Sequence, residues 1–222
     1  AGLVMARALI KEGVPFDWFE KHSDVGGIWD MDNPNTPMYD SVHFISSKYT
    51  SGFFGFPMPN EFPDYPNWKQ ILQYIRSFAD KYDLRSKVTF NTTVEHAKPL
   101  PGDKWEIKFS NGQSNIYDGL INATGVTWHA NRPAIQGEDK FKGQIIHSVE
   151  YRQPEEFAGK RVLVVGAGNS GVDIASDASV YADQAFLSVR RGYRFIPKYL
   201  FGLPTDALIS GKIAPPKGVS VT

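Results

Sequence analysis

Three glycines with GxGxxG spacing have the residue type and order of a nucleotide-binding turn. Gly166, Gly168 and Gly171 directly follow the apolar run of residues 162–165, which predicts a parallel strand buried on both faces. In such a turn the first glycine permits a tight bend, the second lets a pyrophosphate approach the backbone, and the third lets the next helix pack on the strand. Apolar positions in residues 172–175 predict that helix. This context favours nucleotide binding over the alternative, a purely structural glycine turn.

The residues after the next predicted strand indicate which nucleotide would bind. Residues 185–189 predict that strand, and Arg190 and Arg191 follow it. An NAD site usually places a carboxylate about 20 residues after the first glycine, where it binds the ribose 2′-hydroxyl. A guanidinium can instead bind a 2′-phosphate bidentately. The arginines therefore favour NADP, and two solvated surface arginines are the alternative.

The start of the chain follows the same plan a second time. Apolar residues at helical spacing between positions 3 and 10 end at Gly13, and residues 16–19 predict a strand that closes on Glu20. Gly2 would then be the third glycine of a GxGxxG turn, so we expect the first strand and the first two glycines to precede residue 1. Glu20 falls at the spacing of the carboxylate that binds a ribose 2′-hydroxyl. An ordinary carboxylate at a strand end is the alternative for Glu20.

Two further segments have residues that allow a ligand to approach the backbone. Gly26 and Gly27 suit a close approach, and Trp29 offers a flat apolar wall, although a tight turn with a core tryptophan explains the same residues. Later, the small residues 122–125 follow the predicted strand 116–121 and would also let the backbone meet a ligand.

The middle of the chain predicts elements that would position these segments. Residues 39–68 are rich in aromatic residues and prolines, which predicts either a packed loop over a flat ligand or a separate hydrophobic cluster. Residues 67–82 predict an amphipathic helix with Asn67 as its N-cap. The remaining expected elements are a strand at 88–94, a hairpin of 105–109 and 116–121 with Asn111-Gly112 at the turn, and a linker at 152–156.

Composition excludes several other functions. The 222 residues include 24 Lys and Arg and 24 Asp and Glu, so there is no basic field for nucleic acid. The absence of cysteine removes disulfides, thiolate metal sites and dithiol chemistry. No apolar run reaches the roughly 18 residues that span a membrane. The five histidines lack metal-ligand spacing, and no nucleophile elbow occurs, so we expect no metal site and assign no catalytic residue.

A further sequence pattern connects these observations to a known family. Phe141, Gly143, His147 and Tyr151 form the pattern FxGxxxHxxxY just before the glycine turn at Gly166. Together with the two nucleotide-binding plans, this pattern resembles the fingerprint of the class B flavin-dependent monooxygenases. Tyr151 points to the branch that oxygenates nitrogen and sulfur, because Baeyer–Villiger enzymes usually carry Trp there.

The resemblance implies an α/β fold with two Rossmann-like dinucleotide-binding domains. An FAD-binding domain would span residues 1–152, and an inserted NADP-binding domain would span residues 153–222. We expect both domains to be incomplete in this chain, since the tail from Gly202 to Thr222 has no closing element.

The resemblance also implies roles for individual residues. His147 and Tyr151 would organise the junction between the domains. The FAD site would include Gly2, Glu20, Gly26, Gly27 and Trp29. The NADP pyrophosphate would be held by Gly166, Gly168, Asn169, Ser170 and Gly171, and its 2′-phosphate by Arg190, with Arg191 beside it. The segment that connects both sites would consist of Ala123, Thr124 and Gly125.

The chemistry implied by the resemblance depends on the cofactors. NADPH would reduce the flavin, oxygen would add to give a C4a-hydroperoxyflavin, and a nitrogen or sulfur atom of a small organic substrate would take the distal oxygen. The family often carries Asn where this chain has Ile45, which cannot hydrogen-bond. A Baeyer–Villiger enzyme, an NADPH oxidase-type flavoprotein and a catalytically silent NADP-binding fragment stay open as alternatives. The resemblance allows a homodimer, and we expect a cytoplasmic location.

Overall fold

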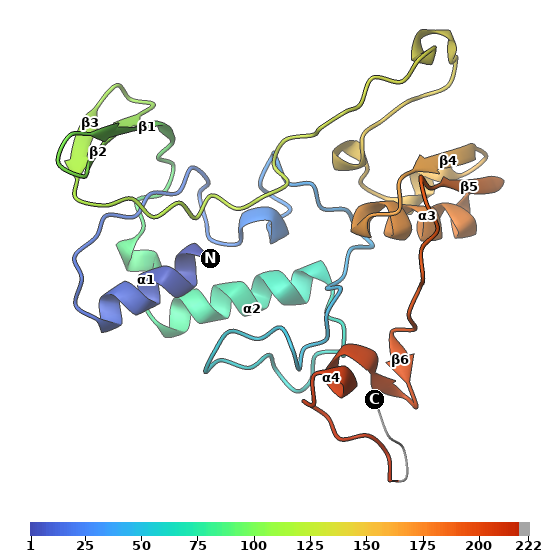
Figure 1. Cartoon of the computed structure of the whole chain (residues 1–222), viewed down its shortest axis with the longest axis horizontal. Helices are drawn as coiled ribbons and strands as arrows, with labels where there is room; N and C mark the ends of the chain where they lie inside the picture. The colour runs from blue at the N-terminus through green and yellow to red at the C-terminus, as the bar shows by residue number, and fades with distance from the viewer. Residues whose placement is uncertain (218–222) are drawn as a thin grey trace.

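The computed structural model describes residues 1–217, and the last part of the predicted second domain, residues 218–222, lies outside them. Its regular elements in chain order are α1 (Gly2–Lys11), α2 (Trp68–Lys81), β1 (Val94–Leu100), β2 (Lys104–Phe109), β3 (Ser114–Tyr117), β4 (Arg161–Val165), α3 (Asn169–Tyr181), β5 (Gln184–Ser188), β6 (Tyr199–Leu200), β7 (Leu203–Pro204) and α4 (Thr205–Ile209). Figure 1 shows α1, α2 and the β1–β3 sheet at one end, and β4, α3 and β5 at the other.

The helix α2 supports the first half of the molecule. It confirms the helix predicted at 67–82, and Asn67 forms the predicted N-cap: its side chain accepts from the Gln70 amide, and the Gln70 side chain accepts from the Asn67 amide. Phe78 and Ala79 are fully buried and pack with Leu3 of α1. The amphipathic pattern therefore joins α1 and α2 through an apolar core.

The aromatic segment 39–68 has no long regular element and packs around α2. Phe53 stacks on Tyr74 at a ring distance of 5.1 Å, and Phe56 lies 5.4 Å from the ring of Phe78. Met58 is buried in the same cluster region. The hydrophobic-cluster interpretation accounts for this packing, because these side chains fill the surface of α2.

The small sheet has the order β1-β2-β3 and is antiparallel throughout. The predicted hairpin is confirmed, with Trp105 opposite Tyr117. Its second strand ends at Tyr117, so the prediction that it continues to residue 121 was wrong. Pro99 lies in β1, an edge strand, where its missing N–H interrupts no central ladder.

Two predicted strands were wrong. Residues 88–94 form no strand before Val94, because Asn91 adopts a left-handed conformation with φ 54° and breaks the extended run. Residues 16–19 form only an isolated parallel bridge between Phe19 and Thr89. Backbone hydrogen bonds from the Thr89 amide to the Trp18 carbonyl and from the Glu20 amide to the Thr89 carbonyl hold this short contact together.

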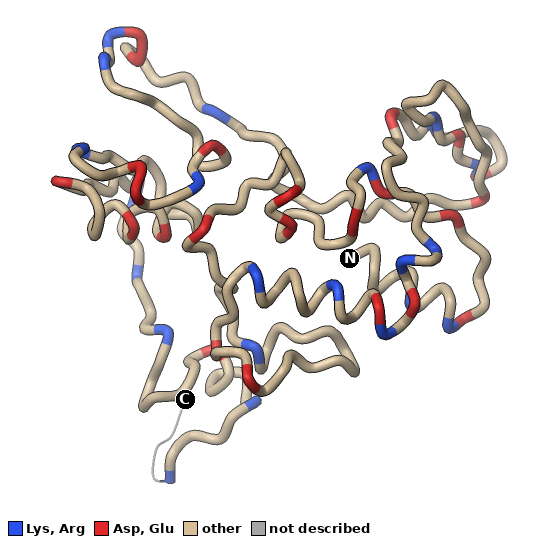
Figure 2. Tube along the Cα trace, turned by 180° about the vertical axis from the view of Figure 1, so that it is seen from behind, with Lys and Arg blue, Asp and Glu red and all other residues tan. Residues whose placement is uncertain are grey.

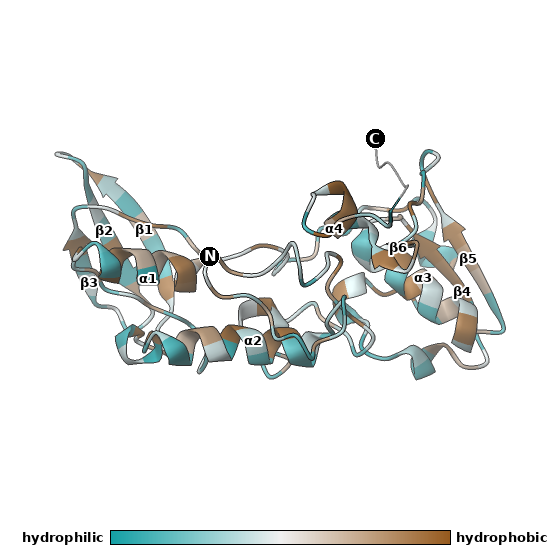
Figure 3. Ribbon diagram, turned by 90° about the horizontal axis from the view of Figure 1, so that it is seen from below, coloured by the Kyte–Doolittle hydropathy of each residue, from teal (hydrophilic) through white to brown (hydrophobic). Residues whose placement is uncertain are grey.

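The second half contains the predicted βαβ unit. β4 and β5 are parallel, with Val162 opposite Ala185, and α3 lies between them in sequence. Val162 and Val164 pack against the cluster that contains Ile174 of α3. Leu163 is 61% exposed and Val165 is 67% exposed, so the prediction that this strand is buried on both faces was wrong. The reason is that, within the described residues, α3 packs on one face of the pair, which Val162 and Val164 share. Figure 3 shows the apolar colouring of β4 and β5.

Aromatic side chains join the half that contains α1, α2 and β1–β3 to the half that contains β4, α3 and β5. Tyr151 is 1% exposed and stacks on Phe157 with ring centres 5.0 Å apart. Tyr39, from the aromatic segment, lies 5.4 Å from the Tyr151 ring, and all three pack with Ala178 of α3. In the segment predicted as a linker, 152–156, residues Pro154–Phe157 form a short 3-10 helix.

The surface of the described residues carries both signs of charge. Figure 2 shows lysine and arginine interspersed with aspartate and glutamate along the trace. None of the helices in residues 1–217 combines the length and the apolarity that a membrane crossing requires.

Candidate functional site

The second glycine turn has the geometry that its sequence predicts. Gly166 adopts φ +100°, a conformation that side chains rarely allow. A Cβ atom on Gly171 would lie 2.2 Å from the carbonyl oxygen of Gly166, so only glycine lets α3 pack this close to the turn. A Cβ atom on Gly168 would meet nothing within 4 Å. The space beside Gly168 is therefore open to a ligand, whereas Gly171 serves the packing of the helix.

The start of α3 presents unpaired amides beside this open space. The first backbone hydrogen bond of the helix runs from the Val172 amide to the Gly168 carbonyl. The amides of Asn169, Ser170 and Gly171 have no backbone acceptor within the described part of the chain. Free amides and the positive end of the helix dipole together favour an anionic group such as a pyrophosphate.

The arginine pair lies at the same edge of the sheet as the glycine turn. The Gly166 amide donates to the Ser188 carbonyl at 2.9 Å, which brings the ends of β4 and β5 together. Arg190 and Arg191 follow Ser188 by two and three residues, and both are exposed. Parallel α/β units bind ligands at this carboxyl edge. The structure thus brings the predicted pyrophosphate and 2′-phosphate residues to one edge.

The predicted residues of the first site also meet in part. A Cβ atom on Gly2 would lie 3.7 Å from Ala123 Cβ and 3.5 Å from the Trp18 ring. The start of α1 repeats the arrangement of α3, since its first backbone hydrogen bond runs from Met5 to Ala1. Gly2 and the Ala123-Thr124-Gly125 segment therefore lie side by side, although they are about 120 positions apart in the sequence.

Glu20 lies close to this group. Its Oε1 atom accepts from the His22 amide at 2.9 Å, which leaves Oε2 available to a further donor. The next residue, Lys21, holds its Nζ atom 5.0 Å from the ring centre of Trp128. Trp128 in turn donates from Nε1 to the Thr124 carbonyl at 2.7 Å. These contacts tie the 123–125 segment to the neighbourhood of Glu20.

The Gly26-Gly27 turn has a structural explanation of its own. Gly26 adopts φ +140°, and a Cβ atom there would lie 2.6 Å from Leu72 Cδ1 of α2. Trp29 is partly buried, with its ring 5.3 Å from Phe44. Both residues thus pack against the protein, as the alternative of a tight turn with a core tryptophan expects.

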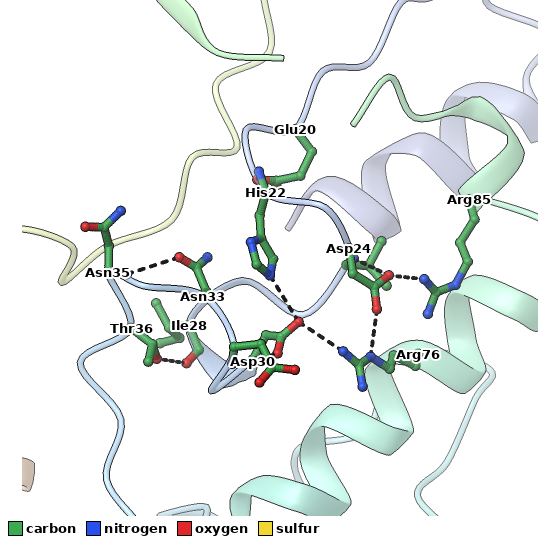
Figure 4. Close-up of polar contacts among 12 residues, drawn as sticks. Glu20, His22, Asp24, Ile28, Asp30, Asn33, Asn35, Thr36, Arg76 and Arg85 are labelled. Atoms are coloured by element: carbon green, nitrogen blue, oxygen red, sulfur yellow. Dashed lines mark hydrogen bonds and ion pairs between the residues drawn. The ribbon is translucent and has the colours of Figure 1, made fainter. Parts of the chain in front are cut away.

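A network of charged side chains holds this turn, and sequence reasoning missed it. Asp30 is 1% exposed, and its Oδ2 lies 3.0 Å from Arg76 Nη2 and 3.3 Å from His22 Nε2. Arg76 Nε also lies 2.9 Å from Asp24 Oδ2, at an angle that makes an ion pair without a hydrogen bond. Arg85 pairs with the same Asp24 (Figure 4). The only signal in the sequence was the pair of aspartates on either side of Gly26 and Gly27.

The fingerprint residues have separate structural roles. The Tyr151 hydroxyl donates to Asp177 Oδ2 of α3 at 2.8 Å, and burial together with this carboxylate raises the pKa of Tyr151 far above its usual range. His147 Nδ1 accepts from the Val149 amide at 3.2 Å. A Cβ atom on Gly143 would lie 2.6 Å from the ring of Phe141, so glycine is required for this ring to fold back.

The two groups of predicted site residues lie apart in the fold. Gly2 and the 123–125 segment belong to the half that contains α1, and the glycine turn at Gly166 lies at the other end (Figure 1). Within residues 1–217 no three His, Asp or Glu side chains come close enough to hold a metal ion.

The fold and this geometry define an α/β protein with a βαβ unit whose glycine turn is open to a ligand, and comparison with known proteins supplies the family. A profile of the flavin-binding monooxygenase-like family matches residues 1–215, and the chain belongs to this family. Flavin-containing monooxygenase 5 from Homo sapiens is 36% identical over 227 residues, which cover 96% of this chain and 43% of that protein. The chain therefore spans less than half the length of the curated relatives it matches.

Solved structures support the same fold. S-allyl-L-cysteine S-oxygenase from Allium sativum superposes with a TM-score of 0.77 at 24% identity, covering 90% of this chain and 51% of that one. A structure of OTEMO in complex with FAD and NADP superposes with a TM-score of 0.65 at 28% identity, covering 84% of this chain and 36% of that one. The α/β fold with Rossmann-like units is thus common to this chain and to these structures.

Proposed function

We propose that the protein containing this chain is an NADPH- and FAD-dependent monooxygenase that oxygenates a nitrogen or sulfur atom of a small organic substrate. The observation that carries the proposal is the carboxyl edge of β4 and β5. There the open turn at Gly168, the free amides of Asn169 and Ser170, and the exposed Arg190 gather. Membership of the flavin-binding monooxygenase-like family supports the same function.

The residues at this edge fit NADP. The free amides at the start of α3 would bind the pyrophosphate, with Gly168 allowing its close approach. Arg190 and Arg191 would bind the 2′-phosphate, which a carboxylate at this place would repel. Gly166 and Gly171 would hold the turn and the helix in place. The complex of OTEMO with NADP supports this assignment through the shared fold.

The first group of residues fits FAD in the same way. The amides at the start of α1, from Gly2 on, would face the phosphates, and the free oxygen of Glu20 would accept from a ribose hydroxyl. The 123–125 segment would lie along the cofactor between the two sites. Gly26, Gly27 and Trp29 would form a wall of the site, held by the ion pairs of Asp30. We propose the boundary between an FAD-binding and an NADP-binding domain at residues 152 and 153.

The chain's own part in the reaction is binding, orientation and exclusion of water. When bound, FAD supplies the activation of oxygen and NADPH supplies the reducing equivalents. The apolar residues around Trp29 and Phe44 would limit access of water. We assign no side chain as acid or base. A homodimer and a cytoplasmic location, both consistent with the family resemblance, belong to the same proposal and are tested by gel filtration and cell fractionation.

The test uses the intact protein that contains this chain. We expect a bound flavin spectrum, preference for NADPH over NADH, and an N-oxide or sulfoxide product from a tertiary amine or a thioether. An ester formed from a ketone would identify a Baeyer–Villiger enzyme instead. NADPH oxidation that yields hydrogen peroxide without product would identify an oxidase, which Ile45, 58% exposed and unable to hydrogen-bond, would favour. NADP binding without flavin or turnover would identify a silent protein.

A further inference from the structure

A carboxylate outside both nucleotide sites collects hydrogen bonds from the aromatic segment. Asp206, in the first turn of α4, accepts at Oδ2 from the Ser47 amide at 2.7 Å and from the Thr50 hydroxyl at 2.6 Å. The Tyr65 hydroxyl lies 3.4 Å from its Oδ1 and donates more strongly to the Lys198 carbonyl, at 2.7 Å. Donors from three separate positions in residues 47–65 thus converge on one short C-terminal segment.

Asp206 itself is partly exposed, and several of the residues around it are buried. Ser47 is 0% exposed, and Ala207 and Leu208 beside Asp206 are buried. Within residues 1–217 no lysine or arginine pairs with Asp206, so neutral donors satisfy its charge. Burial by itself would raise the pKa of Asp206, but the hydrogen bonds from Thr50 and Ser47 outweigh it and lower the pKa. The side chain is therefore ionised at neutral pH.

The position of Asp206 in the chain gives the contact its significance. The segment that contains it follows Arg190 and Arg191 and reaches α4 through β6 and β7. Ser47, at the other side of the contact, comes two residues after Ile45 in the aromatic segment. The Thr50 amide donates to the Ser47 carbonyl at 3.1 Å, so residues 47–50 form one turn, and the single hydroxyl proton of Thr50 is directed to the nearer Asp206 carboxylate, which holds the turn from outside.

We propose that Asp206 is a positioning residue that fixes the turn of residues 47–50, and with it Ile45, against the segment of β6, β7 and α4 that follows Arg190 and Arg191. The proposal rests on the proposed function for its catalytic consequence. If the turn moves, Ile45 moves with it, and so does the neighbouring Phe44, whose ring lies beside Trp29 and would limit access of water. More of the NADPH is then consumed without product, while binding of NADP, which depends on another edge, stays unchanged.

The test compares Asp206→Ala, Asp206→Asn and Thr50→Val in the intact protein, with Asp139→Ala as the control. Asp139 also lies in the first turn of a short helix, and its carboxylate makes no hydrogen bond within the described part of the chain. We measure amide hydrogen exchange at residues 47–50 and the ratio of product to NADPH consumed. Loss of a charge-assisted hydrogen bond predicts about tenfold faster exchange at Ser47 in Asp206→Ala, with a severalfold lower product ratio.

The variants separate positioning from a general loss of structure. Asp206→Asn retains an oxygen that can accept from Ser47, so it restores most of the exchange protection and the product ratio. Thr50→Val keeps the carboxylate and gives a smaller effect of the same sign, even if Asp206→Ala does not fold. Unchanged exchange at Ser47 in both Asp206→Ala and Thr50→Val, or an equal change in Asp139→Ala, overturns the proposal. A wild-type protein without flavin and product overturns the proposed function, whereas the exchange at Ser47 still decides the role of Asp206.

Discussion

The hydroxyl of Tyr151 lies 2.8 Å from Asp177 Oδ2, and the same oxygen accepts from Ser41 at 2.5 Å. One carboxylate of α3 thus binds the fingerprint segment and the aromatic segment at the same time. Asp173, one turn earlier, accepts from Tyr39 at 3.0 Å. Because α3 also begins at the glycine turn, the helix whose amides we propose bind the nucleotide is held directly by the other half of the protein.

Removing the Tyr151 hydroxyl tests this connection. Tyr151→Phe keeps the ring stacked on Phe157 and removes one donor to Asp177. We expect the free energy of unfolding to fall by about 1 to 2 kcal/mol, as for loss of a buried hydrogen bond to a charged group. Tyr181→Phe, an exposed tyrosine of the same helix, should change it by less than about 0.5 kcal/mol. Urea unfolding measures the free energy of unfolding of both variants. Equal effects in Tyr151→Phe and Tyr181→Phe would show that the Tyr151 hydroxyl does not stabilise the contact with Asp177.

Two glycines of the same turn should respond differently to alanine. Gly171→Ala forces a Cβ atom against the Gly166 carbonyl and should lower the free energy of unfolding by about 2 to 3 kcal/mol. Gly168→Ala has open space and an ordinary φ of −73°, so stability should change by no more than about 1 kcal/mol. Gly168→Ala should nevertheless weaken NADP binding, since the new methyl group occupies the place of the pyrophosphate. Thermal unfolding and NADP titration measure the pair, and unweakened binding by Gly168→Ala contradicts the assignment.

The arginine after β5 should determine the choice between NADPH and NADH. Arg190→Ala should weaken NADPH binding about 10- to 100-fold, because a charge-assisted contact to the 2′-phosphate is lost, and leave NADH nearly unchanged. Arg161→Ala, at the opposite end of the sheet, is the matched control and should affect neither. Dissociation constants for both nucleotides provide the measurement. A loss that is the same for NADH and NADPH would exclude Arg190 as the 2′-phosphate ligand.

The ion pairs around Asp30 should contribute unequally to stability. Arg76→Met leaves the buried Asp30 carboxylate with His22 as its remaining side-chain partner and should cost about 2 to 4 kcal/mol. Arg85→Met removes a partner of Asp24, whose side chain is 21% exposed against 2% for Asp30, so the expected cost is about 1 kcal/mol or less. Denaturant unfolding distinguishes the two. A greater loss of unfolding free energy in Arg85→Met than in Arg76→Met would show that burial of Asp30 does not determine the stability contributed by these ion pairs.

Acid should weaken the contact made by Asp206. Its pKa in the folded protein lies below the ordinary value of 3.8, so its stabilisation is complete above that pH and is lost as the pH falls through the lowered value. Asp206→Asn does not titrate at this position. The stability difference between the wild type and Asp206→Asn should therefore be constant from about pH 7 to about pH 5 and shrink toward about pH 3. Urea unfolding across this range measures it, and a difference that grows on acidification contradicts the prediction.

The parts of the fold predicted well are those that local sequence determines. The strand, glycine turn and helix at Arg161–Tyr181 follow from an apolar run and three glycines whose backbone requirements are local. The cap at Asn67 and the turn at Asn111-Gly112 are local in the same sense. The predictions of strands at 16–19 and 88–94 were wrong, because strand formation depends on the neighbouring strands in the sheet. The periodicity of one segment carries no information about those neighbours.

The long-range polar contacts could not be predicted for a similar reason. Asp206 and Ser47 are 159 positions apart, and neither belongs to a motif. Asp30 gave no sign that it would be buried, since burial depends on Arg76 from α2. By contrast, Gly2 and Ala123 could be assigned to one neighbourhood, because both were expected to meet the same ligand. The roles of these residues in cofactor binding stay predictions.

The hydrogen-bonded contacts at the carboxylates of Asp173, Asp177 and Asp206 have a common chemical form. In each, a carboxylate accepts hydrogen bonds from neutral hydroxyl or amide groups, and among residues 1–217 no positively charged side chain takes part. Dissolved salt screens the attraction between opposite charges, as in the exposed pair of Lys104 and Asp118. Within residues 1–217, these three carboxylate contacts contain no pair of opposite charges. The contacts of the aromatic segment with α3 and α4 should therefore keep their strength as the ionic strength changes.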